Sequence, residues 1–212
     1  VNKNVGLKQY AITYVLDGGV NHADNPQTYD MYDSVALQSP LKTGYVFEGW
    51  YCDKEYAEKV AEIRTGMKGA LTLYARWVPI TYTVKFDGNG AQGGYVSDMT
   101  QCKYDEVYSL TPNVYTKRSH VFREWNTEPD GSGKAYKNMA SVKNLSAENG
   151  AVITLYAQWK MTTYNIAFDG NGATAGMMNG ITGCKYDVAA ALTGNNYVRT
   201  GYTFTGWNTK AD

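Results

Sequence analysis

The sequence predicts an α+β fold that is β-rich and built from tandem copies of one small module. Three observations lead to this prediction: a sequence pattern that recurs along the chain, strands in which apolar and polar residues alternate, and a short segment with helical spacing. Composition agrees with folded modules, because 43% of the 212 residues are hydrophobic and 14% are aromatic. A tandem array of one module restricts both the fold and the range of functions.

One pattern occurs twice almost unchanged, as Tyr82-Thr-Val-Lys-Phe-Asp-Gly-Asn-Gly90 and Tyr164-Asn-Ile-Ala-Phe-Asp-Gly-Asn-Gly172. A looser copy, Ile12-Thr-Tyr-Val-Leu-Asp-Gly-Gly19, lies near the start of the chain. Each copy is followed, in the same order, by a Tyr-Asp pair and by an aromatic segment that ends in tryptophan. The closing signal Leu-Tyr-Ala-x-Trp follows the first two copies, at Leu73–Trp77 and Leu155–Trp159.

These repeats divide the chain into a leader and three modules, with boundaries at residues 1–9, 10–79, 80–160 and 161–212. The third module has no closing signal, so we expect it to be truncated at its C-terminal end. The absence of a starting methionine and of a signal peptide is typical of a fragment of a longer protein. The linkers between modules are about four residues long, which is too short for the modules to tumble freely.

The first strand of each module has one apolar face, formed in the first module by Ile12, Tyr14 and Leu16. Alternation of this kind indicates a strand with one face on a core. The Asp-Gly-Asn-Gly sequence that follows favours a tight hairpin, because its residues tolerate positive φ. We expect the next apolar run, such as Val35–Leu37, to form the second strand. The closing strand places Leu73, Ala75 and Trp77 on one face by the same rule.

A helix is predicted in the first module between Asp53 and Met67. Tyr56, Val60 and Ile63 are spaced i, i+4 and i+7, which is the spacing of a short amphipathic helix. Asp53 is the candidate N-cap. Residues 135–145 occupy the same place in the second module and have a weaker helical pattern. Each module is therefore expected to be a small mixed sheet crossed by about one helix.

Charge and composition exclude several classes of function. The 20 basic and 20 acidic residues balance, and no basic stripe is available to neutralise phosphates, so nucleic acid binding is not expected. No run of about 18 apolar residues is present that could span a membrane. The only histidines, His22 and His120, do not repeat, and no motif places a serine or cysteine beside either of them. We therefore expect no catalytic residues and no enzyme activity in this chain.

Metal and cofactor sites are not expected either. Cys102 and Cys184 occupy equivalent positions in successive modules, Cys52 has no counterpart, and no Cys-x-x-Cys pair is present. Small buried or half-buried thiols are the favoured interpretation. The Asp-Gly-Asn-Gly segments lack the alternating acidic ligands and the distal glutamate of a calcium loop. A turn that needs these residues for conformational reasons is favoured over a metal site.

The aromatic residues are the remaining candidates for ligand binding. Five tryptophans recur at matched positions, which favours core packing over a carbohydrate platform; they are Trp50, Trp77, Trp125, Trp159 and Trp207. Tyrosines that differ between copies are the better candidates for ligand contact. Those that we single out are Tyr95, Tyr108, Tyr115 and Tyr197.

Taken in order, these motifs resemble the Listeria–Bacteroides repeat family, the B-repeat of internalin-type surface proteins. The resemblance covers residues 10–212 and implies a ubiquitin-like β-grasp module, with the mixed sheet and short helix expected above. It also implies a non-catalytic repeat of secreted or wall-attached bacterial proteins, often arranged as a tandem stalk. The second module departs from the pattern, with His120 in place of the usual tyrosine and Glu124 in place of glycine.

Two functional hypotheses follow, and both place the chain outside the cell, on a bacterial surface or secreted. In the first, the repeats are a stalk that displays other domains of the same polypeptide, which predicts a rigid rod with short linkers. In the second, the repeats are a multivalent adhesin that binds immunoglobulin, glycans or surface glycoproteins of a host or microbe. The adhesin hypothesis predicts that affinity rises steeply with module number.

Overall fold

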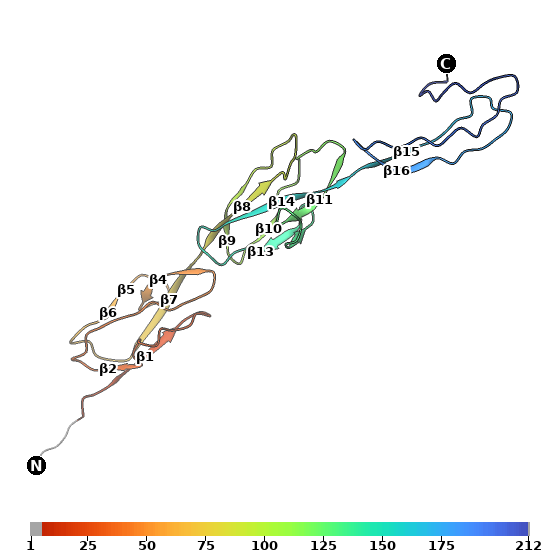
Figure 1. Ribbon diagram of the computed structural model, residues 1–212. Helices are drawn as coiled ribbons and strands as arrows, with labels where there is room; N and C mark the ends of the chain where they lie inside the picture. Colours follow the sequence, from red (N-terminus) through yellow and green to blue (C-terminus); the bar gives the residue numbers. More distant parts are fainter. Residues whose placement is uncertain (1–5, 212) are drawn as a thin grey trace, which may run out of the picture. The chain divides into compact units, whose positions relative to one another are not determined.

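Every regular element between residues 6 and 211 is a β-strand, and this part of the chain contains no helix. A computed structural model describes residues 6–211, and Figure 1 traces the strands along the chain. Contacts group the residues into two compact units. Of the described residues, the first unit contains 6–87, 97–112 and 138–155, and the second contains 88–96, 113–137 and 156–211.

The first repeat forms a mixed sheet of five strands in the order β2-β1-β7-β4-β5. Strand β1 is parallel to β7, with Ile12 opposite Leu71, whereas β4 is antiparallel to β7. Strands β3 and β6 pair separately as a two-stranded sheet. The strands are β1 Tyr10–Val15, β2 Thr28–Tyr29, β3 Val35–Ala36, β4 Tyr45–Tyr51, β5 Lys59–Val60, β6 Glu62–Ile63 and β7 Leu71–Pro79.

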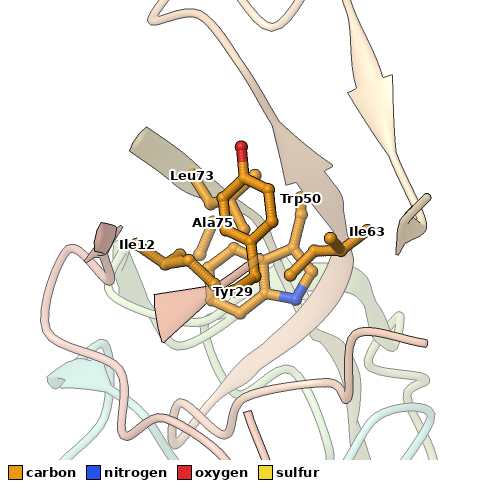
Figure 2. Close-up of a cluster of buried hydrophobic side chains, with 6 residues drawn as sticks. All are labelled: Ile12, Tyr29, Trp50, Ile63, Leu73 and Ala75. Atoms are coloured by element: carbon orange, nitrogen blue, oxygen red, sulfur yellow. The ribbon is translucent and has the colours of Figure 1, made fainter. Parts of the chain in front are cut away.

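The core of the first repeat lies on one face of this sheet. Figure 2 shows its buried side chains gathered around the rings of Tyr29 and Trp50; the other members are Ile12, Ile63, Leu73 and Ala75. Tyr14, Leu16 and Trp77 pack against this cluster, so the predicted apolar faces of the first and closing strands are confirmed. Each large apolar side chain buried in this way contributes roughly 1.5–3 kcal/mol to stability.

The second repeat has the same topology, with a sheet in the order β12-β11-β14-β8-β9 and a separate pair β10-β13. Its central strand β14 corresponds to β7, and its tryptophan strand β11 corresponds to β4. The strands are β8 Thr81–Asp87, β9 Met99–Lys103, β10 Val107–Ser109, β11 His120–Asn126, β12 Ala135–Tyr136, β13 Ser141–Lys143 and β14 Val152–Met161.

The predicted α+β class, with a short helix in each module, is wrong. Where the helix was expected in the first repeat, the chain forms a turn and then β5 and β6. The Asp53 carboxylate does accept backbone N–H groups, from Ala57 and Glu58 at 2.9 Å each, but it closes a loop rather than capping a helix. Tyr56 has a φ of 57°, which stops helical winding at that residue.

The apolar spacing that suggested a helix belongs to two very short strands. Val60 on β5 lies opposite Trp50, and Ile63 on β6 lies opposite Val35. Both side chains reach the core because the chain changes sheets between them. The second repeat repeats this arrangement, since β12 pairs with β11 and β13 pairs with β10 across the segment expected to be helical.

The expected tight hairpin after the first strand is also replaced by a longer connection. In the second repeat, β8 does pair with β9, but the loop between them is long, and its Gly93 forms an isolated β-bridge with Thr116. In the first repeat, β1 pairs with Thr28–Tyr29 rather than with the predicted Val35–Leu37 segment, which pairs instead with β6.

The Asn-Gly residues themselves behave as their conformational preferences predict. Asn89 and Gly90 have φ values of 47° and 80°. The Asn89 side chain then uses its amide to tie the turn to the rest of the repeat, donating to the carbonyl oxygens of Pro129 at 2.8 Å and Ala157 at 2.9 Å.

The described residues of the third repeat, up to 211, contain one antiparallel strand pair, β15 Thr163–Ile166 with β16 Ile181–Lys185. The segment 202–207 corresponds to β4 and β11 but forms no strand. This sequence contains no third Leu-Tyr-Ala-x-Trp segment, so 202–207 and β15 lack the strand that lies between their counterparts. As expected from that loss, Trp207 is only half-buried, whereas Trp50 and Trp125 are 2% and 0% exposed.

Candidate functional site at the repeat junctions

The recurrent tryptophans stabilise each repeat from within. In the first repeat, the Phe47 ring packs edge-on against Trp50 and Trp77, with centroid distances of 5.3 and 5.5 Å. The indole N–H of Trp77 donates to the Leu16 carbonyl oxygen at 2.8 Å, which ties the closing strand to the end of the first strand. The equivalent Trp159 donates to Gly88 at 2.9 Å. Through these contacts, the tryptophan rings pack within their own repeats.

The four candidate tyrosines lie in different surroundings. Tyr95 is 73% exposed in a loop, and the Tyr108 hydroxyl on β10 donates to Glu106 at 2.7 Å. Tyr115 and Tyr197 occupy equivalent positions, where they pack edge-on against Trp125 and Trp207 at 6.3 and 6.2 Å; the Tyr197 hydroxyl also donates to the Phe168 carbonyl. Of the four, Tyr95 offers the most free surface.

The structure brings no cluster of metal-ligating groups together within residues 6–211. No group of three or more His, Cys, Asp or Glu side chains in this part of the chain is arranged to hold a metal ion. The cysteines described are free thiols, with Cys102 and Cys184 buried and Cys52 half-buried. Residues 6–211 also include no helix long and apolar enough to cross a membrane.

Successive repeats are joined by a single residue between two strands. Strand β7 ends at Pro79 and β8 begins at Thr81, with Ile80 between them, whereas Thr162 alone separates β14 from β15. The linking residue is tied by its amide to the start of the preceding tryptophan strand: Ile80 N–H donates to the Gly44 carbonyl at 3.0 Å, and Thr162 N–H donates to Ser119 at 2.8 Å. The four-residue linkers suggested by the sequence are therefore mostly strand.

Side chains from two repeats meet at the first junction, which we define as Gly44, Tyr45, Ile80, Tyr104 and Asp105. The Tyr45 hydroxyl donates to the Asp105 carboxylate at 2.8 Å, and its ring lies edge-on to Tyr104 with centroids 6.0 Å apart. Ile80 is buried at 4% exposure, and its carbonyl accepts a hydrogen bond from Tyr104 N–H at 3.0 Å. The first two repeats are thus linked by polar, aromatic and backbone contacts.

Asp105 is held in place by its own repeat. Asn144 donates its amide to the carboxylate at 3.1 Å and accepts the Asp105 backbone N–H at 2.6 Å, and Lys143 Nζ lies 3.0 Å from the same carboxylate. The hydrogen bond from Asn144, with those from Lys143 and Tyr45, lowers the pKa of the Asp105 carboxyl to about 2. The hydrogen bond to Asp105 in turn raises the pKa of the Tyr45 phenol. The pair therefore remains a neutral phenol donating to a carboxylate across the neutral pH range.

Gly44 is the position at which the Tyr104 ring comes closest to the preceding repeat. A Cβ atom built on Gly44 would lie 2.2 Å from the nearest ring carbon of Tyr104, far inside van der Waals contact. Its φ of 78° also favours glycine. The absence of a side chain at residue 44 is therefore what allows the Tyr104 ring to pack there.

An open pocket of about 480 Å³ adjoins this junction. Its walls come mostly from the segment before and at the start of β4, and Ala147 of the second repeat completes them. Lys42 lies over the Tyr45 ring, with Nζ 4.3 Å from the ring centroid, and pairs with Asp17 at 3.5 Å. None of the four candidate tyrosines lines this pocket.

The junction residues were not singled out from the sequence. Tyr45 and the Tyr104-Asp105 pair were recognised only as markers of the repeat, because nothing in a single chain indicates that they face each other. One signal was available: the Tyr-Asp pair recurs in every copy yet is polar, so its recurrence is not explained by core packing.

The fold and its junctions define a class of protein built from tandem all-β repeats joined almost without linkers. The chain belongs to the Listeria–Bacteroides repeat family, whose repeat domain matches residues 10–76, 82–158 and 164–212. The match includes all three copies of the sequence pattern, so the resemblance inferred from the motifs is confirmed.

Two curated relatives come from Evansella cellulosilytica. One, named "Putative membrane protein", is 28% identical over 210 residues, covering 97% of this chain and 29% of the relative. The other, named "Putative Gly-rich membrane protein", is 36% identical over 174 residues, covering 79% of this chain and 18% of the relative. The chain therefore spans less than a third of the length of these relatives.

Proposed function

We propose that this repeat region is a stalk in a secreted or cell-wall-attached bacterial surface protein, where it displays other domains of the same polypeptide. The observation that carries the proposal is the first junction, where one buried residue separates two strands and side chains of both repeats are hydrogen-bonded. A spacer must resist folding back on itself, and a one-residue connection between hydrogen-bonded strands restricts such bending.

The placement of the connecting strand also suits a spacer. Strand β7 lies at the centre of its sheet, with β1 on one side and β4 on the other, and it continues through Ile80 into β8. A stretching force applied along the chain would act on β7, which is hydrogen-bonded to β1 on one edge and to β4 on the other. Such a strand separates only when two ladders break, which favours mechanical resistance.

The surface location and the non-catalytic role rest on the family and its relatives. Listeria–Bacteroides repeats match three ranges between residues 10 and 212, and the two relatives described above have the words "membrane protein" in their names. The two histidines are far apart in the sequence and are bound locally: His22 lies 3.7 Å from Asp24, and His120 Nδ1 lies 2.7 Å from the Arg118 carbonyl oxygen. We propose that the repeats act by spacing rather than by catalysis.

Residual dipolar couplings of the isotope-labelled chain test the stalk proposal. If the first two repeats are fixed to each other, amides of β1, β4 and β7 and amides of β8, β11 and β14 will fit one alignment tensor. Two tensors of different magnitude, in a protein whose repeats are each folded, would overturn the proposal.

A matched pair of variants connects this result to the junction. Tyr45→Phe keeps the ring but removes the hydroxyl that binds Asp105. We therefore expect the first and second repeats of this variant to require two different alignment tensors. Tyr32→Phe is the control, because Tyr32 is a tyrosine of the same repeat that is 63% exposed, and its backbone is hydrogen-bonded to Asp30 and Thr65 rather than to a junction residue. It should leave the tensors unchanged.

A second candidate function, adhesion, is favoured by one observation, the 73% exposure of the Tyr95 side chain in a loop. Exposed tyrosines provide contact area for proteins and glycans at low entropic cost. Binding to immobilised immunoglobulin, mucins and bacterial polysaccharides, compared between this chain and Tyr95→Ala, tests this proposal. Binding that Tyr95→Ala abolishes would support adhesion, and the absence of binding across the panel would reject it.

A further inference from the structure

The two junctions have the same backbone arrangement but different side chains. We define the second junction as Ser119, His120, Thr162, Tyr186 and Asp187, the residues equivalent in sequence to those of the first. In both, the amide of the linking residue donates to the residue before the tryptophan strand. At the second junction, the Thr162 hydroxyl donates to the same Ser119 carbonyl at 3.0 Å. The backbone tether is therefore present at both junctions.

The first difference is the residue that begins the junction. Gly44 leaves room for the Tyr104 ring, whereas Ser119 carries a Cβ at the equivalent position, with a φ of 59°. Because a Cβ at position 44 would lie 2.2 Å from that ring, a tyrosine cannot pack against Ser119 in the same way. Accordingly, the Tyr186 ring lies against Tyr164 of its own repeat, with centroids 5.3 Å apart.

The second difference is His120 in place of Tyr45. An imidazole is shorter than a phenol and has no hydroxyl at its tip, so it cannot span the distance that Tyr45 spans to reach Asp105. The His120 ring instead contacts the Arg118 carbonyl of its own repeat at 2.7 Å. Within residues 6–211, no hydrogen bond or ion pair joins His120 to Asp187.

The third difference is the linking residue and its surroundings. Ile80 is buried and its carbonyl accepts the Tyr104 amide, whereas Thr162 is half-buried. No corresponding bond from Tyr186 N–H to the Thr162 carbonyl forms in the described part of the chain. Four features of the first junction are thus missing at the second: the ring contact, the charge-assisted hydrogen bond, the backbone hydrogen bond to the carbonyl of the linking residue, and the burial of that residue.

We propose that the second junction is a hinge and the first is a stiff joint, and that the residue pair Gly44-Tyr45 or Ser119-His120 determines which one forms. The hinge retains the two hydrogen bonds from Thr162, through its amide and its hydroxyl, to the Ser119 carbonyl. Both bonds meet at one carbonyl, so β15 and β16 can rotate about this point while β11 and β14 stay fixed. The region is then a stalk with one point of bending, and this proposal rests on the proposed stalk function.

Exchanging the two pairs tests this proposal in both directions. In the unmodified chain, residual dipolar couplings of β15 and β16 should fit a tensor of lower magnitude than those of β11 and β14, while the first two repeats share one tensor. The double variant G44S/Y45H should lower the magnitude for the first repeat relative to the second. The reverse variant S119G/H120Y should raise the magnitude for β15 and β16 toward that of the second repeat.

Folding is monitored through the indole N–H signals of Trp50 and Trp125, which are buried in their own repeats and should not shift in either variant. A shared tensor across the second junction in the unmodified chain would overturn the hinge. Unchanged tensors in G44S/Y45H would overturn the role of the pair. Flexibility at the first junction of the unmodified chain would instead reject the stalk, so failure of the two proposals can be distinguished.

Discussion

Single tryptophans carry a large part of the stability of each repeat. Trp125 is 0% exposed, and its ring packs against Phe122 and Tyr115 at centroid distances of 5.0 and 6.3 Å. Trp125→Ala should lower the free energy of unfolding of the second repeat by about 3–5 kcal/mol, because it leaves a cavity in the core. Urea unfolding followed through amide signals of the second repeat measures this loss.

The matched control for this substitution is Tyr95→Ala, which removes an aromatic ring that is 73% exposed. We expect a change within about 0.5 kcal/mol. Equal losses for the two variants would mean that the tryptophan is not a core residue.

The first junction should respond to pH only in strong acid. The pKa of Asp105 is lowered, first by Asn144, to about 2, below its ordinary value of 3.8. A carboxyl whose pKa is depressed by folding contributes stability above its unfolded pKa and loses it as pH falls through the folded value. The contribution from Asp105 should therefore be complete above pH 4 and vanish between about pH 4 and 2. The carboxyl ¹³C chemical shift of Asp105 reports this titration.

Asn144→Ala separates this cause from general acid effects. It removes the largest influence on the Asp105 carboxyl, so the titration midpoint should move up toward the ordinary value. A midpoint that stays near 2 would show that Lys143 and Tyr45 alone account for the depression.

At the scale of elements, the sequence predicted strands well and the helix badly, for a physical reason. Alternation along residues 12–16 and 73–77 fixes the inward face of a strand, and both segments pack as predicted. The helix prediction rested on Tyr56, Val60 and Ile63. Val60 and Ile63 are three residues apart, a spacing that a helix face shares with two short strands separated by one residue. Pairing with Trp50 and Val35 decides between these alternatives, and those partners are distant in sequence.

The Asn-Gly turn gives a test of how a loop is anchored to its repeat. Asn89 combines a positive φ of 47° with two side-chain hydrogen bonds, to Pro129 and Ala157. Asn89→Ala should cost the second repeat about 1–3 kcal/mol, because it leaves carbonyl groups without their donor. Asn89→Gly relieves the backbone strain but still loses the hydrogen bonds, so it should cost less. Equal losses would mean that the φ angle makes no contribution; urea unfolding of each variant measures the difference.

At the scale of the whole molecule, the sequence revealed the repeats but not the contacts between them. The three copies could be aligned from the order of their motifs, and the family match confirms that three repeats are present. The site at the first junction could not be derived, because Tyr45 and Asp105 are 60 residues apart and belong to different copies. A repeat shows what each module needs internally, whereas a junction depends on how consecutive modules meet. The difference between Gly44-Tyr45 and Ser119-His120 can be interpreted only when the position of the Tyr104 ring against Gly44 is known.

The repeats of this chain should also differ in local stability along their length. In the first two repeats, the tryptophan strand pairs with the closing strand, so the amides of β4 and β11 that face β7 and β14 are hydrogen-bonded. The equivalent segment 202–207 forms no strand, and Phe204 is 48% exposed. Unpaired backbone exchanges its amide hydrogens with solvent at nearly the rate of a mobile loop, whereas amides in a core strand exchange only on larger openings. Hydrogen–deuterium exchange should therefore label 202–207 first, and 45–51 and 120–126 much later.

A peptide with the sequence of residues 152–161, added in excess, supplies a strand of the missing type and should slow exchange in 202–207 by pairing with it. Equal protection of all three segments in the chain alone would show that another segment already occupies the place of the closing strand.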